Sequence, residues 1–234
     1  MDDGSLLRIL VATDIHLGKH ENHPIRGVDS FEAFSEVMQI AKSTKPDILL
    51  LGGDLFDNIN PSMKALYSCL RELKDVVFDE SEGDDSIQIE VEGYQPNYLN
   101  KNLNIRLPIF SVHGNHDYPE ELDGRSVFDL LQESNYINYI GRHKNTEVVH
   151  VEPLIISKGT TKVALYAMGY INTVKLSRLF ERKKITFANP PEDTFNIMLI
   201  HQNRFKGKRP GADYEQCVHP SNLPKWINLL IWCH

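Results

Sequence analysis

Short apolar runs alternate with amphipathic stretches along much of the chain. Nearly continuous apolar runs are typical of strands that are covered on both faces. The predicted strands of this kind are residues 6–13, 47–51, 109–113, 195–200 and 227–232. We expect the first of these, residues 6–13, to be a central strand. Apolar positions at helical spacing predict helices at residues 31–42, 61–77, 123–133 and 174–182. This alternation predicts an α/β fold with parallel strands.

The pattern changes after Asn135. Residues 148–156 and 161–168 predict two adjacent strands, joined by a turn-forming cluster at 157–160. Two other segments look inserted. Residues 79–102 are acidic and polar and predict an exposed or partly disordered insertion, while residues 203–224 combine basic residues with prolines and glycines.

Composition limits the class of protein. A chain of 234 residues with 41% hydrophobic residues fits one α/β domain, or one domain with a small appendage. The net charge of −7 argues against general attraction to nucleic acid or anionic membrane, although a local basic patch or bound cations can still hold phosphate. The three cysteines have no metal-binding spacing, and neither a signal peptide nor a membrane-spanning stretch is evident. We therefore expect a soluble, intracellular protein.

Residues that commonly bind metals follow each of the five apolar runs. In chain order they are Asp14, His16, Asp54, Asn115, His116, Asp117, His201 and His234. Because the ends of parallel strands meet at one edge of a sheet, we expect these side chains to converge. Carboxylate, amide and imidazole donors together favour manganese, iron or zinc over calcium. Such a set can hold two cations about 3.5–4 Å apart, a spacing that supports phosphoester hydrolysis.

Each part of this series also has an ordinary structural interpretation. An Asp-x-His or Gly-Gly-Asp sequence after a strand is usually a turn or a cap. The sequence Gly114-Asn115-His116-Asp117 is more specific, but alone it leaves both interpretations open. All the parts occur in order, each at the end of a predicted strand, and this favours a metal site.

The same residues resemble the motifs of the calcineurin-like metallophosphoesterases. Longer stretches resemble the eukaryotic double-strand-break repair nuclease of the meiotic recombination eleven family, whose bacterial relative is SbcD. These stretches are residues 12–18, 53–56, 104–117, 158–166 and 201–203. The resemblance covers nearly the whole chain. It implies two packed mixed β-sheets flanked by helices, and a manganese-dependent DNA exonuclease or endonuclease of double-strand-break repair and meiosis.

The resemblance also implies two Mn²⁺ ions per chain. One would be held by Asp14, His16 and Asp54, and the other by Asp54, Asn115, His201 and His234.

His116 matches the catalytic histidine of the family. It would donate a proton to the leaving 3′ oxygen, with Asp117 orienting its ring. Alternatively, His116 only orients Asn115.

Three departures from the family pattern affect these expectations. Asp57 stands where close relatives carry a histidine, so the exonuclease role of that histidine does not carry over. Cys233 replaces a glycine, and we expect its side chain to crowd His234. The chain ends at His234, before the last histidine of the family, a ligand of the first metal. We therefore expect residues 1–234 to be a truncated nuclease domain with impaired activity, without the family's capping and ATPase-binding regions.

Expected partners follow from the basic segment and from the resemblance. The segment after His201 could hold a DNA backbone, or be a solvated loop, through Arg204, Lys206, Lys208 and Arg209. The resemblance implies a homodimer that bridges DNA ends through the helices at 61–77 and 123–133. Its candidate contacts, which could equally be core residues, are Leu66, Leu70, Val127 and Leu131. The resemblance further implies an ATPase subunit, an adaptor subunit associated with residues 79–102, and a nuclear location.

Two alternatives to the nuclease remain open. Asp57 completes a Gly-Asp-x-x-Asp pattern found in phosphatases, which favours a general metal-dependent phosphoesterase. The absent last histidine and Cys233 favour a catalytically silent module for dimerisation or DNA binding.

Overall fold

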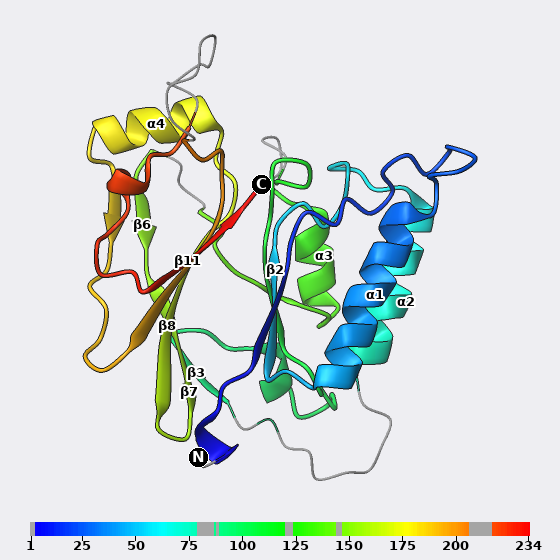
Figure 1. Cartoon of the computed structure of the whole chain (residues 1–234), viewed down its shortest axis with the longest axis horizontal. Helices are drawn as coiled ribbons and strands as arrows, with labels where there is room; N and C mark the ends of the chain where they lie inside the picture. The colour runs from blue at the N-terminus through cyan, green and yellow to red at the C-terminus, as the bar shows by residue number, and fades with distance from the viewer. Residues whose placement is uncertain (1–2, 79–86, 88, 120–123, 144–146, 206–216) are drawn as a thin grey trace.

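The computed structural model describes residues 3–78, 87, 89–119, 124–143, 147–205 and 217–234. Two β-sheets pack face to face between helices (Figure 1). The first sheet has the order β1 (Ile9–Ala12), β2 (Ile48–Gly52), β4 (Ile109–Val112), β5 (Asn138–Tyr139). The second has the order β11 (Leu229–Cys233), β10 (Phe195–His201), β8 (Thr161–Met168), β7 (Pro153–Lys158), β3 (Glu90–Glu92). A separate pair is formed by β6 (Val149–Val151) and β9 (Ile185–Phe187).

Strand direction differs between the two sheets. Every neighbouring pair of the first sheet is parallel. In the second sheet β11, β10 and β8 are parallel, while β7 and β3 are antiparallel to their neighbours. The expected α/β fold of two packed sheets is confirmed, with the correction that only the second sheet is mixed.

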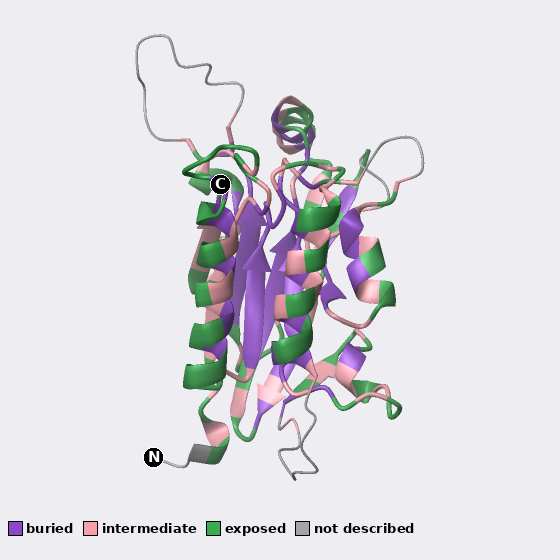
Figure 2. Cartoon of the chain, turned by 90° about the vertical axis from the view of Figure 1, so that its right-hand side faces the viewer, coloured by how far each residue is buried: buried purple, intermediate pink, exposed green. Residues whose placement is uncertain are grey.

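Helices cover the outer faces of the sheets. Three of them, α1 (Asp29–Thr44), α2 (Met63–Val77) and α3 (Val127–Glu133), lie on the first sheet. The fourth, α4 (Thr173–Glu181), packs on the second sheet. Figure 2 shows that these helices turn their buried residues inward and their exposed residues outward, as amphipathic helices do. Short 3₁₀ helices lie at Asp3–Ser5, Asn97–Leu99 and Pro220–Asn222.

Alternation along the strands divides the core into three clusters. Leu49 and Leu51 of β2 face the helices of the first sheet, whereas Ile48 and Leu50 face the second sheet. Side chains at successive strand positions point to opposite faces, so a continuous apolar run serves both clusters. Tyr166 of β8 belongs to the third cluster, beneath α4. Burial on both faces therefore explains why these strands read as apolar runs.

Three expectations about individual segments are wrong. Residues 6–13 do not form a central strand, because β1 is an edge of the first sheet and Val11 is 39% exposed. Both faces of β1 are nevertheless packed against core clusters, which produces the same apolar run. Residues 148–156 divide into β6 and β7 at Pro153, which has no N–H to donate to a ladder. The third segment is the insertion.

The described part of the insertion, residues 87 and 89–102, is not simply exposed. It contributes β3, which pairs with β7, and Ile89 is 3% exposed within the core between the sheets. Asn97 is also buried, and its backbone N–H donates to Asn138 Oδ1 at 2.7 Å. Residues 79–86 and 88 lie outside the described residues. The segment is partly buried, and not simply exposed as expected, because apolar residues such as Ile89 lie between its acidic residues.

The helix predicted from residue 61 begins at Met63 instead. The Ser62 hydroxyl accepts the N–H of Ala65 at 3.1 Å and so caps α2. Within the described residues, no helix combines the length and apolar character needed to cross a membrane.

Candidate metal centre

The candidate ligands gather at the carboxyl ends of five strands. β1, β2 and β4 lead to Asp14, Asp54 and Asn115, while β10 ends at His201 and β11 is followed by His234. Within each sheet these strands are parallel, so their carboxyl ends lie at one edge of that sheet. The two edges adjoin, because ligand atoms of Asp14 and Asp54 lie within 4.8 Å of those of His201 and His234. The convergence predicted from the sequence is therefore present.

Backbone hydrogen bonds join the first two ligand loops beyond the ends of their strands. The N–H of Asp14 donates to the Gly53 carbonyl at 3.1 Å, and the N–H of His16 donates to the Asp54 carbonyl at 2.9 Å. A further bond of 2.8 Å runs from Leu17 N–H to the Leu55 carbonyl. The loops at 14–17 and 53–57 are thus fixed against each other.

Four candidate ligands have positive φ angles. The angle is 103° at His234, and it lies in the left-handed region at Asp14 (54°), His16 (51°) and Asp54 (49°). This conformation costs about 1–2 kcal/mol per residue with a side chain, and such strain is concentrated at functional sites. Gly53, just before Asp54, has a φ of 94° that suits glycine.

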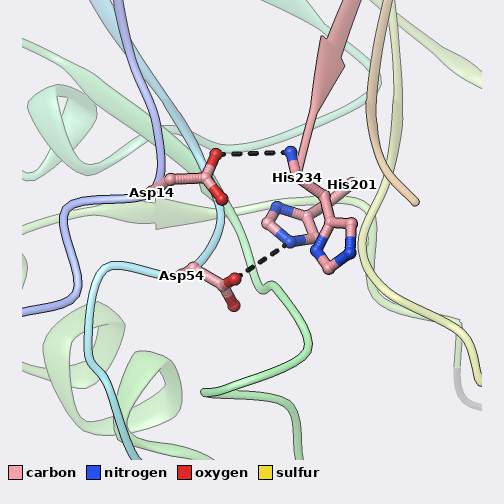
Figure 3. A group of neighbouring side chains, drawn as sticks. All are labelled: Asp14, Asp54, His201 and His234. Atoms are coloured by element: carbon pink, nitrogen blue, oxygen red, sulfur yellow. Dashed lines mark hydrogen bonds and ion pairs between the residues drawn. The ribbon is translucent and has the colours of Figure 1, made fainter. Parts of the chain in front are cut away.

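Figure 3 shows the first ligand group, which consists of Asp14, Asp54, His201 and His234. Each offers one ligand atom, and these atoms lie within 4.8 Å of one another. His201 Nε2 is 3.2 Å from Asp54 Oδ2, and the N–H of His234 donates to Asp14 Oδ2 at 3.3 Å. Asn115 belongs beside this group, because its Oδ1 lies 3.3 Å from His201 Nε2.

The second ligand group consists of His16, Asp54 and His116. His16 Nε2 is 3.7 Å from Asp54 Oδ2, and the His16 and His116 rings meet edge to face at 4.7 Å. The two groups share Asp54, as expected for a bridging carboxylate. The grouping differs from expectation in two respects. Asp14 was expected to share a cation with His16 but lies in the first group, and His116 was expected to be a proton donor but lies among the second group of possible ligands.

Hydrogen bonding determines which nitrogen of His201 can face a cation. Its Nδ1 lies 2.7 Å from the Gly52 carbonyl, so Nδ1 carries the proton and Nε2 faces Asp54. Burial opposes the charged form of Asp54, but the hydrogen bond and charge of His201 outweigh it and lower the Asp54 pKa. For His201, burial opposes protonation, and the same contact with Asp54 outweighs it and raises the pKa.

His116 is held by its backbone and by Asp57. Its N–H donates to Asp54 Oδ1 at 2.8 Å, and its Nδ1 lies 3.0 Å from the Asp57 carbonyl oxygen. The side chain is 40% exposed, so a substrate can reach it.

The expectation that Asp117 orients the His116 ring is wrong. The Asp117 carboxylate is buried and accepts the N–H groups of Gly114 at 2.7 Å and Phe56 at 3.0 Å. Burial raises its pKa to about 7. Asp117 therefore clamps two ligand loops together, because its position in the turn directs it inward.

Cys233 does not remove His234 from the site. The thiol is buried against Gly52, where an added Cβ would lie 2.3 Å from Cys233 Sγ. The absence of a side chain at Gly52 thus accommodates the cysteine. The expectation that Cys233 crowds His234 is wrong in this respect, since the imidazole remains in the first ligand group.

The other predicted residues have mixed outcomes. Arg204 is exposed, with its guanidinium 5.7 Å from the Trp232 ring centroid. Lys206, Lys208 and Arg209 lie outside the described residues. Val127 and Leu131 are 6% and 2% exposed in the core under α3, so their prediction as dimer contacts is wrong. Leu66 and Leu70 are partly buried against the same core, and their role in a dimer stays a prediction.

Sequence reasoning missed two residues that support the ligands. Thr13 Oγ1 donates to Asp14 Oδ2 at 2.6 Å. Asp57 Oδ1 lies 3.0 Å from His16 Nδ1. Asp57 follows Asp54 by three residues in one turn, and this short spacing was the available signal.

The donor set fits divalent cations. Two carboxylates, an amide oxygen and several imidazoles converge, and one carboxylate is common to both groups. A profile of the family described as calcineurin-like phosphoesterase matches residues 7–226. The chain belongs to the calcineurin-like phosphoesterase family. Members of this family use divalent metals, which agrees with the shared carboxylate.

Similar proteins within the family include several repair proteins. The chain is 40% identical over 248 residues to the double-strand break repair protein MRE11 of Mus musculus, and 39% identical to that of Homo sapiens. Double-strand break repair protein mus-23 of Neurospora crassa is 36% identical over 242 residues. These alignments cover 99–100% of this chain and 32–34% of the relatives. The chain thus spans about a third of the length of these relatives, and the resemblance noted in the sequence is confirmed.

Proposed function

We propose that this phosphoesterase domain hydrolyses DNA phosphodiester bonds with two Mn²⁺ ions, as part of double-strand-break repair. The observation that carries the proposal is the pair of ligand groups joined at Asp54. The names of the similar proteins supply the substrate class. Manganese is proposed because mixed oxygen and nitrogen donors suit it better than calcium.

We assign the proposed ligands to two cations according to the two groups. Asp14, Asn115, His201 and His234 would hold one cation, His16 would hold the other, and Asp54 would bridge them. Two cations bound there would supply a nucleophilic water near neutral pH and neutralise the charge of the phosphate.

His116 would transfer a proton during the reaction. Because its Nδ1 donates to the Asp57 carbonyl, its Nε2 is the atom that can exchange a proton with the leaving 3′ oxygen. His116 also lies beside His16 and Asp54, so direct metal binding is its alternative role. Asp117 supports the proposal differently, by holding the loop that carries His116.

Arg204 would contact the DNA backbone next to the metal centre. It is exposed three residues after His201, and a guanidinium near the Trp232 ring is held with less freedom than a solvated one. Lys206, Lys208 and Arg209 are proposed to extend this contact. The wider proposal includes a nuclear homodimer that binds DNA ends, and ATPase and adaptor subunits of the repair complex.

The test is cleavage of end-labelled linear DNA by the purified chain in MnCl₂ and in EDTA. We expect manganese-dependent cleavage that falls by about 10²–10³-fold in Asp54→Ala and by at least about 10²-fold in His116→Ala. Asp75→Ala is the matched control, because Asp75 is exposed and pairs with Lys42. A metal-binding assay on each variant separates loss of metal from loss of the proton donor.

Two results would overturn the proposal. Hydrolysis of an aryl phosphate without DNA cleavage would indicate the general phosphoesterase, which the Asp57 pattern favours. DNA binding without any hydrolysis would indicate a silent binding module. Equal cleavage by His116→Ala and the unchanged chain would remove His116 from the mechanism.

A further inference from the structure

Asp57 is the acidic residue on which both histidines of the second ligand group converge. Its Oδ1 lies 3.0 Å from His16 Nδ1 and 3.9 Å from His116 Nδ1. Its carbonyl oxygen lies 3.0 Å from the same nitrogen of His116. One residue therefore contacts the rings on either side of Asp54.

The two nitrogens of His16 face different acids. Nε2 faces the shared carboxylate of Asp54 at 3.7 Å, and Nδ1 faces Asp57. Nδ1 is buried and has no aligned hydrogen bond within the described residues, so Asp57 is the acceptor that a small rotation would engage. A histidine that binds a cation through Nε2 keeps its proton on Nδ1, and an acceptor there fixes the ring and increases its basicity.

The backbone fixes Asp57 in this position. The N–H of Asp57 donates to the Leu17 carbonyl at 3.1 Å, next to the bond between Leu17 and Leu55. The Asp57 side chain is only 22% exposed, and that of His16 is 17% exposed. The contact thus belongs to two joined loops, and is not a chance encounter of mobile surface side chains.

We propose that Asp57 is a positioning residue. It orients the His16 ring toward the cation that His16 and Asp54 would share. Its carboxylate accepts the Nδ1 proton of His16 and directs Nε2 toward the metal. This inference rests on the metal site of the proposed function, and it is independent of DNA as the substrate. It gives a role to the aspartate that stands in place of the expected histidine.

A surface ion pair with Lys19 is the competing role for Asp57. Lys19 Nζ lies 3.6 Å from Asp57 Oδ1, but the lysine side chain is 44% exposed. Exposed pairs of this kind contribute little, because solvent screens their charges. Lys19→Ala therefore separates the two roles.

The test is calorimetric titration of MnCl₂ into the metal-free chain. We expect Asp57→Ala to weaken one of two binding steps by about 10–100-fold. Asp57→Asn should lose less, because its amide oxygen still accepts the Nδ1 proton. Lys19→Ala and Asp75→Ala should match the unchanged chain. In the double variant His16→Ala, Asp57→Ala, the loss should equal that of His16→Ala alone, because Asp57 acts through His16.

A second measurement does not depend on how Asp57→Ala folds. Nitrogen NMR of the unchanged, metal-free chain should find neutral His16 protonated at Nδ1, and Asp57→Asn should retain that tautomer. The inference is overturned by a dominant Nε2–H tautomer, by Mn²⁺ affinities of Asp57→Ala within twofold of the unchanged chain, or by additive losses in the double variant. If Mn²⁺ binds as expected but DNA is not cleaved, the nuclease proposal fails and this inference stands. If the chain binds no Mn²⁺, both fail.

Discussion

The two ends of β2 contain aspartates with opposite surroundings. Just before the strand, Asp47 Oδ1 lies 2.7 Å from Lys158 Nζ, and Oδ2 accepts the Arg8 N–H at 2.7 Å. Just after it, Asp54 faces His201 and His16, whose charges depend on protonation. Asp47 is paired with a lysine, whereas the charge next to Asp54 depends on whether His201 and His16 are protonated.

This difference separates stability from function. The pair of Asp47 and Lys158 joins the start of β2 to the end of β7, so it connects the two sheets. At the other end, two carboxylates and several histidines remain close together around Asp54. A buried charge without a fixed counter-charge is costly, and bound cations would relieve that cost. Asp47, before β2, should therefore contribute to the stability of the fold, whereas Asp54, after β2, should respond to metal.

The largest expected effect comes from breaking the ion pair of Asp47 and Lys158. Lys158→Met leaves Asp47 without its cation, and we expect the free energy of unfolding to fall by about 3 kcal/mol. Urea unfolding in EDTA measures this change. Lys42→Met is the matched control, because it breaks the exposed pair with Asp75 and should cost at most about 1 kcal/mol. Equal effects of the two variants would remove the proposed contrast, as would a change in Mn²⁺ affinity caused by Lys158→Met.

Metal removal should have a smaller effect for each site that is emptied, confined to the other end. At a free Mn²⁺ concentration of 100 times the dissociation constant, one site stabilises the fold by about 2.7 kcal/mol. We therefore expect Mn²⁺ to raise the melting temperature of the unchanged chain, and EDTA to reverse the rise. Asp54→Ala should show neither shift, whereas Lys158→Met should retain both. A melting temperature indifferent to Mn²⁺ would argue against a metal centre at this edge.

The smallest expected effect concerns His143, which is not part of the metal centre. His143 Nε2 is buried and lacks a hydrogen-bond partner within the described residues, and burial lowers the His143 pKa to about 4. The unfolded chain therefore binds a proton that the folded chain refuses, between pH about 6.5 and 4. Stability should be complete above pH about 6.5 and fall as the pH drops through that window.

His143→Gln tests this dependence by urea unfolding at pH 7.5 and pH 5. The variant should recover about 1–2 kcal/mol of the stability that the unchanged chain loses between these pH values. A pH dependence identical to that of the unchanged chain would contradict the expectation. The expected recovery would sharpen the contrast between His143 and His201, because contact with Asp54 raises the His201 pKa.

Much of the site could be predicted because the strand ends are marked locally. The run at 47–51 predicts a buried strand, and Asp54 follows it closely enough to lie at its end. The predicted strand at 161–168 corresponds to β8, Thr161–Met168. Val127 and Leu131 were predicted less well, because an apolar side chain on a helix can serve a core or an interface equally. Asp117 was misread because its inward direction depends on two backbone N–H groups from separate loops.

The sequence by itself determined the alternation of strands and helices, and the order of the carboxylates and imidazoles that follow the strands. These features are set by local periodicity, which each segment carries within itself. Only the tertiary structure decided that β1 and β11 are edges, that Asp14 groups with His201 and His234, and that Asp57 faces His16. Those contacts join residues distant in sequence or depend on how loops lie against each other. Their geometry therefore follows from packing of the sheets and not from any local pattern.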